Sequence, residues 1–97
     1  MTAKTKKLKK QIKLGEFIKQ MRLDRGYSQA ELAVNLGYMS PQFISDWERG
    51  ISSPPVKKLP ELASLLDVKT DVIFNLLVDL AKEQLVASLS KEYNQIK

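Results

Sequence analysis

The sequence contains no cysteine and no histidine. The absence of cysteine excludes a disulfide framework, a thiol nucleophile and a cysteine-ligated zinc site. The absence of histidine removes the commonest general base and metal ligand. Serines and carboxylates remain, but no Gly-x-Ser-x-Gly turn, phosphate-binding glycine loop or regularly spaced carboxylate group accompanies them. We therefore expect no enzyme, no metal, no cofactor and no evident small-molecule site.

Long hydrophobic runs are also missing. The most apolar segment, from Val72 to Leu89, is interrupted by Asp79, Lys82 and Glu83, which a membrane-spanning helix rarely tolerates. The lysine-rich beginning is not followed by the apolar stretch and small-residue cleavage site of a secretory signal. These patterns predict a cytoplasmic protein without a membrane partner.

The 97 residues suffice for one compact domain with tails, because 43% of them are hydrophobic and 28% are charged. Positive charge is concentrated at the beginning, where six lysines precede the first acidic residue, Glu16. These lysines are Lys4, Lys6, Lys7, Lys9, Lys10 and Lys13. The rest of the chain is nearly neutral, with ten basic and eleven acidic residues. A basic arm on a neutral body suits a polyanion such as nucleic acid, although it is equally typical of a merely solvated tail.

The first half of the chain has two helical patterns. Spacings of three and four over residues 14–25, stopped by Gly26, predict a first helix. Ser28 and Glu31 have the spacing of a capping box and predict a second helix of about nine residues that ends at Gly37. The predicted inward-facing residues are Leu14, Phe17, Ile18, Met21, Leu32, Ala33 and Leu36.

A third helix is predicted after a short turn. Ser40 is suited to the N-cap and Pro41 to the first helical position, where no backbone donor is needed. Ile44 and Trp47 face inward, and Gly50 supplies a left-handed stop. Two short helices joined by a glycine-containing turn are typical of a helix-turn-helix.

Two further helices are predicted in the second half. Leu59, Leu62, Ala63 and Leu66 mark the fourth, in which Pro60 is tolerated because it lies in the first turn. Thr70 is the predicted cap of a fifth helix that runs from Asp71 almost to the C-terminus. That helix would have about 25 residues and a length of ~37 Å.

The outward face of the third helix carries the candidate base-reading residues. Gln42, Ser45, Asp46 and Arg49 form one polar stripe, with Ser40 just before it. Gln42 could pair with adenine, Ser45 could donate or accept, and Asp46 could accept from the amino group of cytosine. Asp46 repels phosphate, so in a complex it has to lie over bases. Spacing alone equally fits the solvated side of an amphipathic helix, with Ser40 as a cap only.

Three segments carry a family resemblance: SQAELAVNLG from Ser28 to Gly37, FISDWERG from Phe43 to Gly50, and LPELASLLDV from Leu59 to Val68. With them, the run from Leu14 to Leu77 resembles the phage repressor and Cro type of helix-turn-helix domain, often called the XRE family. The resemblance implies an all-α, five-helix domain that binds operator DNA, usually as a dimer, with its third helix in the major groove.

The resemblance also implies roles for single residues. Gln29 matches a glutamine that contacts phosphate and braces the recognition helix, although it is also an ordinary first-turn polar residue. Arg22 and Glu48 match a partly buried ion pair between the first and third helices, which is structural. Trp47 is assigned to the core and not to base stacking.

One departure from the family concerns the turn, where six residues separate Gly37 from Ile44 and the commonest form has five. We place the additional residue within 38–40, which keeps Gln42 and Asp46 over the usual base-reading positions. Lys57 and Lys58 lie where relatives touch the DNA backbone, and the basic arm can follow the duplex into a neighbouring groove. The predicted phosphate-contacting residues are Gln29, Tyr38, Lys57, Lys58, Lys9, Lys10 and Lys13.

The C-terminal segment offers a partner surface. Val78, Leu85, Leu89 and Ile96 fall on a heptad seam, which Lys82 and Glu92 interrupt. The seam fits either a homodimer contact or a helix packed within its own chain. A dimer would hold two recognition helices one DNA turn, ~34 Å, apart and predicts a palindromic site.

These patterns predict three parts: a basic arm over 1–13, a DNA-binding domain over 14–78 and a helical extension over 79–97. The first functional hypothesis is a sequence-specific regulator of transcription that binds double-stranded DNA. A repressor is favoured over an activator because no effector domain or activation segment is evident. The alternatives are a protein-interaction module, such as an antitoxin or adaptor, and a nonspecific nucleic-acid packaging protein in which the lysine arm dominates.

Overall fold

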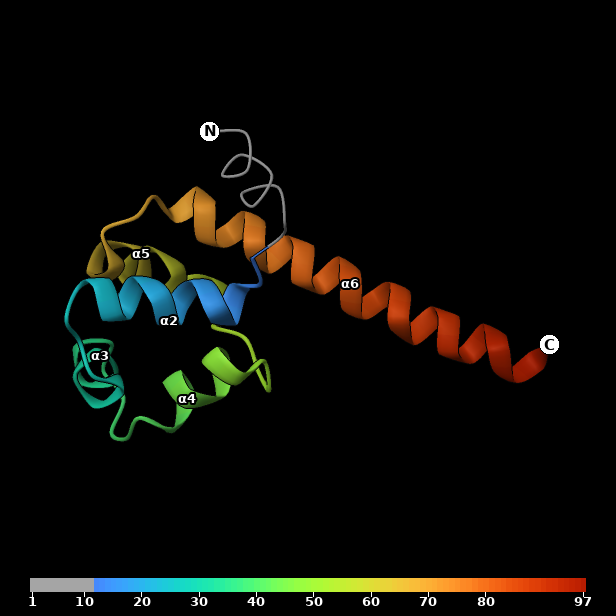
Figure 1. The fold of residues 1–97 in the computed structure, drawn as a ribbon, viewed down its shortest axis with the longest axis horizontal. Coiled ribbons are helices and arrows are strands. Elements are labelled where there is room, and N and C mark those ends of the chain that lie inside the picture. The colour runs from blue at the N-terminus through green and yellow to red at the C-terminus, as the bar shows by residue number, and fades with distance from the viewer. Residues whose placement is uncertain (1–11) are drawn as a thin grey trace, which may run out of the picture.

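The computed structural model describes residues 12–97, which form an all-helical bundle, as the sequence predicted (Figure 1). Its α-helices are α2 (Leu14–Asp24), α3 (Gln29–Asn35), α4 (Gln42–Arg49), α5 (Leu59–Leu66) and α6 (Thr70–Ile96). A single 3-10 turn, η1 (Val56–Lys58), leads into α5 and was not predicted. No helix in this described part of the chain is both long and apolar enough to cross a membrane.

The predicted capping box starts α3. The Glu31 backbone N–H donates to Ser28 Oγ at 3.0 Å, and the Ser28 N–H donates to Glu31 Oε1 at 2.8 Å. These bonds satisfy two of the amide donors that the first turn of a helix leaves unpaired. At the other end of the helix-turn-helix, Gly50 ends α4 with a φ of 77°, as expected. That conformation costs glycine little because it has no Cβ.

Two predicted helix starts were wrong by one residue. Pro41 is not the first residue of α4 but its N-cap, because the Pro41 carbonyl accepts the first helical bond, from the Ser45 N–H. Ser40 still accepts the Gln42 N–H, at 3.3 Å. Thr70 is not the cap of α6 but its first residue, since the residue with extended backbone is Lys69.

The core lies where the four short helices meet the start of α6. Ile44 and Trp47 of α4 are buried there, as predicted. The other buried hydrophobic residues are Leu14, Ile18, Leu32, Ala33, Leu36, Leu59, Leu62, Ala63, Leu66 and Ile73. Phe17 and Met21, also predicted to face inward, are only partly buried and pack against this core. The core fixes α4 to the bundle by its inner face only.

Helices α2 and α4 approach each other closely at Gly15. A Cβ built on this residue would lie 2.6 Å from the carbonyl oxygens of Trp47 and Glu48. Only glycine allows the backbones to come this close, because the obstacle is main chain that cannot rotate away. Gly15 therefore sets the position of α4 against α2.

Helix α6 is longer than the bundle that it belongs to. Its 27 residues correspond to about 40 Å. Only its first part contacts the bundle, and the rest projects away from it (Figure 1). Residues 81–97 are all exposed, so this segment is not packed within its own chain.

Candidate nucleic-acid interface

The candidate recognition helix α4 is held at the surface of the bundle. Its inner residues, Ile44 and Trp47, pack against α2 and α3, while Gln42 and Arg49 on the outer side are exposed. Ser45 and Asp46 are partly exposed. The structure therefore brings these four predicted base-reading residues together on one outward face. Ser40, the fifth, is exposed just before the helix.

The polar side chains of α4 are bonded to one another. Asp46 Oδ1 accepts from Gln42 Nε2 at 2.8 Å and from Arg49 Nη2 at 3.1 Å. Arg49 Nε donates to Ser45 Oγ at 3.2 Å. Neighbours at spacings of three and four on a helix surface are close enough for such bonds. The face is thus a connected network and not a set of independent side chains.

This network modifies the charge argument for Asp46. Its carboxylate lies beside the Arg49 guanidinium, so the two charges offset each other locally. The repulsion between Asp46 and a DNA phosphate is reduced accordingly, because opposite charges at this distance partly cancel beyond a few ångströms. The Asp46 carboxylate also holds the Gln42 amide in one orientation, which the sequence did not predict.

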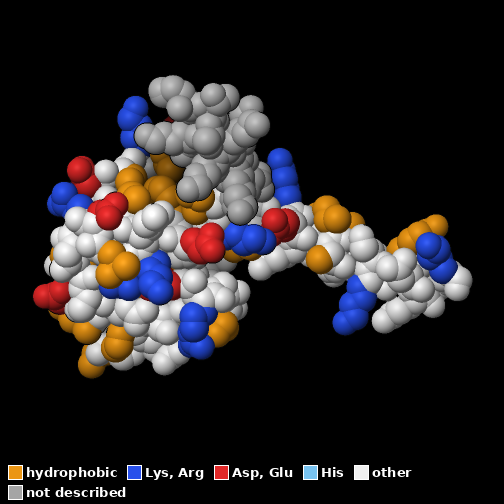
Figure 2. Space-filling view, in the orientation of Figure 1, with side chains coloured by type: hydrophobic (Ala, Val, Ile, Leu, Met, Phe, Trp, Pro, Cys, Tyr) orange, Lys and Arg blue, Asp and Glu red, His pale blue; other side chains and the backbone are white. Residues whose placement is uncertain are grey.

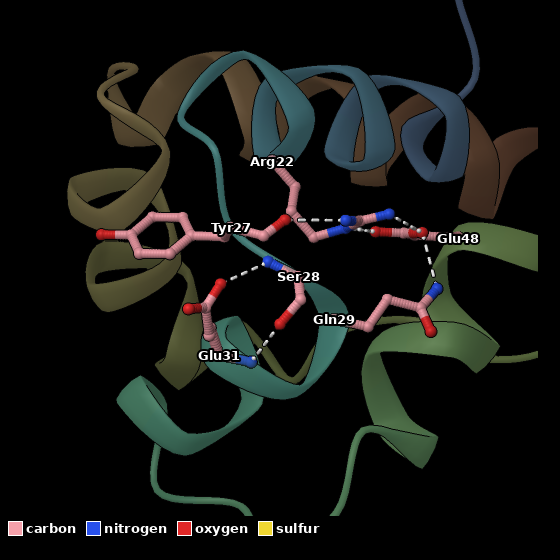
Figure 3. A network of polar contacts seen from close by, with 6 residues as sticks. All are labelled: Arg22, Tyr27, Ser28, Gln29, Glu31 and Glu48. Carbon is pink, nitrogen blue, oxygen red and sulfur yellow. Dashed lines mark hydrogen bonds and ion pairs between the residues drawn. The ribbon is translucent and has the colours of Figure 1, made fainter.

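Beneath α4, a buried polar cluster joins three helices (Figure 3). Arg22 Nε donates to Glu48 Oε2 at 2.6 Å and Arg22 Nη2 donates to Glu48 Oε1 at 3.1 Å. Their side chains are only 7% and 3% exposed. Arg22 Nη1 donates to the Tyr27 carbonyl at 2.8 Å, and Gln29 Nε2 donates to Glu48 Oε1 at 2.9 Å. Two-pronged arginine–carboxylate pairs of this kind fix geometry strongly.

The cluster positions the recognition helix. Arg22 comes from α2, Gln29 is the first residue of α3 and Glu48 lies in the last turn of α4. Because all three side chains meet, a tilt of α4 would break several hydrogen bonds at once, and the Arg22 and Glu48 side chains are too buried for solvent to replace them easily. Gln29 thus bonds to the recognition helix, whereas its contact with phosphate stays a prediction.

The turn between α3 and α4 is apolar at its tip. Met39 is 99% exposed and Phe43, in the first turn of α4, is about half exposed. The Tyr38 ring lies between the rings of Phe43 and Trp47, with centroid distances of 4.7 Å and 5.8 Å. The sequence singled out neither Met39 nor Phe43 for contact with a partner. The sequence feature that could have identified them is a large apolar side chain at a position outside the periodic core pattern.

Lys57 and Lys58 differ although they are neighbours. Lys57 is exposed, as a phosphate contact requires. Lys58 Nζ instead donates to the Leu36 carbonyl at 2.7 Å and to Glu61 Oε1 at 3.3 Å. Its ammonium group also lies 5.4 Å from the centre of the Tyr38 ring. Lys58 therefore caps the end of α3, a role that a long-range contact decides and that the sequence could not show.

The predicted basic arm lies mostly outside the described residues, and Lys9 and Lys10 are among those not described. Lys13 is the N-cap residue of α2. Its Nζ lies 3.1 Å from Glu83 Oε1 of α6, and both side chains are more than half exposed. Exposed pairs of this kind contribute little stability, so the Lys13 ammonium group can exchange one anionic partner for another.

Comparison with known families agrees with this arrangement. A family model described as helix-turn-helix matches residues 18–73, more than half of the chain and most of the bundle. This chain belongs to the helix-turn-helix family of the repressor and Cro (XRE) type. The family assignment that the three sequence segments predicted is therefore confirmed.

Individual family members cover the same region. The HTH-type transcriptional regulator SinR of Bacillus licheniformis is 33% identical over 63 residues, 64% of this chain and 56% of that protein. The SPbeta prophage-derived uncharacterized HTH-type transcriptional regulator YonR of Bacillus subtilis (strain 168) is 37% identical over 59 residues, 61% of this chain and 54% of that protein. The chain thus spans just over half the length of these curated relatives.

A solved family structure has the same bundle. The crystal structure of the biofilm master regulator SinR in complex with DNA aligns with a TM-score of 0.56 and 32% identity. The alignment covers 63% of this chain and 97% of that one. The shared part is therefore the compact bundle and excludes about a third of the present chain.

Proposed function

We propose that this chain is a sequence-specific regulator of transcription that binds double-stranded DNA in the cytoplasm, and not an enzyme. It acts as a repressor by occupying its site, with α4 in the major groove, which is wide enough to admit an α-helix. The observation that carries the proposal is the outward polar face of α4 on a buried, hydrogen-bonded base. The DNA complex of the related regulator SinR supports it.

Gln42 and Asp46 are the central base-reading residues in this proposal. The Gln42 amide, held by Asp46, keeps its carbonyl oxygen and one N–H for the edge of an adenine. Asp46 can exchange its bond to Arg49 for the amino group of a cytosine. Arg49, once released, can donate to guanine or to phosphate, and Ser40 and Ser45 complete the surface.

The surrounding residues position the duplex. Gln29, Tyr38 and Lys57 are proposed to contact phosphates on either side of α4, together with Lys13 and the arm lysines. Lys58 is the weakest candidate, because its ammonium group already binds the Leu36 carbonyl. Each phosphate contact releases counterions, so binding should weaken steeply with salt.

We propose that the chain binds a palindromic site as a homodimer. In such a dimer, two recognition helices related by two-fold symmetry lie one DNA turn apart and each reads one half-site. The dimer therefore recognises a longer sequence than one short helix can. The exposed apolar residues on the projecting part of α6 support self-association.

A protein-binding role is the second candidate, and one observation favours it. Val34, Met39 and Phe43 are exposed on α3, the turn and α4, and apolar groups of this kind often mark protein contacts. In the first proposal, the same side chains contact thymine methyl groups at the rim of α4. The two roles predict different partners for one surface.

Selection of bound duplexes from a random DNA pool, at near-physiological salt, tests the proposed function. The intact protein is compared with a Gln42→Ala, Asp46→Ala variant and with a Gln95→Ala control on the far end of α6. We expect a reproducible motif for the intact protein and the control, and its loss or relaxation in the double variant. Motif-free binding by all three proteins would refute base reading by α4. Tight binding to a protein partner, together with only motif-free binding to DNA, would favour the second candidate.

A further inference from the structure

Helix α6 has two apolar faces, one for the bundle and one that the bundle leaves uncovered. Ile73 is buried, and Leu76, Leu77 and Leu80 pack against the core. The second face is formed by Leu85, Val86, Leu89, Tyr93 and Ile96, each 55–79% exposed. At 100° per residue, its mean direction is about 180° from the first. Hydrophobic side chains are visible along the projecting helix in Figure 2.

This outer stripe carries one charge of each sign. Lys82 falls within the stripe and Glu92 at its edge on the helical projection. The two residues are ten positions apart, about 15 Å along the helix, so they cannot bond to each other in one chain. Among residues 12–97, neither side chain forms an ion pair. Both charges are therefore available to a partner that lies along the stripe.

We propose that the stripe binds the same stripe of a second copy, antiparallel and centred on Ala87. In this register Leu85 of each copy faces Leu89 of the other. The half-buried Val78, which has the same direction on the helical projection as the stripe, faces Ile96. Lys82 of each copy then faces Glu92 of the other, so both charges that interrupt the seam are paired. A parallel arrangement would instead place Lys82 against Lys82 and Glu92 against Glu92, which is repulsive. The sequence of the stripe is thus complementary to itself only when one copy is reversed.

The shape of the molecule permits this pairing. The outer stripe faces away from the bundle, so a second helix can lie along α6 without meeting the core helices. The two bundles then attach at opposite ends, with the Leu77 residues about 30 Å apart along the common axis.

Pairing also explains how the projecting segment is stabilised. Residues 81–97 have no bundle to pack against, apart from the surface ion pair of Glu83 with Lys13. An isolated helix of this length is marginal in water, and amphipathic packing is the usual source of stability for such a helix. The inference rests on the homodimer of the proposed function but not on DNA binding, because the interface contains none of the α4 residues.

Charge reversal tests the register. The dimer dissociation constant of the full chain is measured by sedimentation equilibrium for the wild type, Lys82→Glu, Glu92→Lys and the double exchange, with Gln84→Glu as a charge control off the stripe. In the antiparallel pair, each single change turns two attractions into two repulsions, and we expect about tenfold weaker dimerisation. The double exchange restores both pairs and should recover wild-type affinity. Equal dissociation constants for the wild type and its three Lys82 and Glu92 variants would overturn the antiparallel register.

A second pair of variants tests the surface itself. Leu89→Asp should abolish the dimer, whereas Ser88→Asp, a neighbouring residue off the stripe, should leave it. Circular dichroism shows whether both proteins retain the bundle. A dimer that survives Leu89→Asp, or a wild-type chain that stays monomeric at high concentration, would overturn the proposal. Binding of the Leu89→Asp monomer to a selected half-site is measured separately, so that a failed interface is distinguished from failed DNA binding.

Discussion

Replacing Glu48 by glutamine should destabilise the bundle far more than its single changed atom suggests. Glu48 accepts two hydrogen bonds from Arg22 and one from Gln29. The glutamine side chain keeps one acceptor oxygen and replaces the other by an NH₂ group, which would face a donor. The Arg22 side chain, only 7% exposed, would keep its positive charge without a negative partner.

The magnitude follows from burial. Breaking a buried ion pair by removing one charge costs about 3–5 kcal/mol, because the remaining charge is desolvated without compensation. A small domain has a free energy of unfolding of about 5–15 kcal/mol, so the change would remove a large part of it. In a domain of this size the midpoint of thermal unfolding should fall by at least about 12 °C.

Urea and thermal unfolding, followed by circular dichroism, measure the effect. Glu83→Gln is the matched control, because its ion pair with Lys13 is exposed on both sides and should contribute no more than about 1 kcal/mol. The double variant Arg22→Met, Glu48→Leu should lose less stability than the two single variants combined, since no unpaired charge remains. If Glu48→Gln and Glu83→Gln proved equally stable, the positioning role of the buried cluster would be refuted.

The remaining predictions concern two neighbouring lysines that the sequence treated alike, and Gly15. Lys58→Met should lower the free energy of unfolding by about 1–2 kcal/mol, because it loses the bond to the α3 terminus. Lys57→Met should change the free energy of unfolding by less than about 0.5 kcal/mol. It should instead reduce the salt dependence of DNA binding by roughly one phosphate contact. Chemical denaturation and salt titration separate the two effects. Gly15→Ala should destabilise by about 1–3 kcal/mol despite alanine's better helix propensity, because its Cβ meets the α4 backbone. Lys19→Ala, on the exposed side of α2, is its control in the same denaturation assay, and equal stability of the two variants would contradict the close-approach argument.

Much of the bundle could be predicted because local chemistry decides it. The capping box of α3, the left-handed glycine at the end of α4 and the apolar spacing of α5 depend on residues within a few positions of one another. The start of α4 was misplaced because residue type favours Ser40 as the N-cap and Pro41 as the first helical residue, whereas in the structure Pro41 is the N-cap. The backbone of Pro41 and the hydrogen bond from the Ser45 N–H to the Pro41 carbonyl distinguish the two placements.

The candidate site depends more on contacts between distant residues. The outward direction of Gln42 and Arg49 follows from helical periodicity, so the sequence could place them on one face. The hydrogen bond from Lys58 to the Leu36 carbonyl joins residues 22 positions apart, and no local sequence pattern at either residue predicts it. Gly15 likewise resembles an unfavourable helix residue until α4 is seen against it.

The most direct test of the central claim is the ratio of two affinities. Fluorescence anisotropy, at one fixed salt concentration, measures binding of the intact protein and the Gln42→Ala, Asp46→Ala variant to a selected duplex and to a scrambled duplex of equal length. If α4 reads bases, the variant should lose at least about tenfold in affinity for the selected duplex and little for the scrambled one, since each good base contact discriminates by about 1–3 kcal/mol. An equal change on both duplexes, leaving the ratio as it is in the intact protein, would contradict the assignment of α4 as the recognition helix.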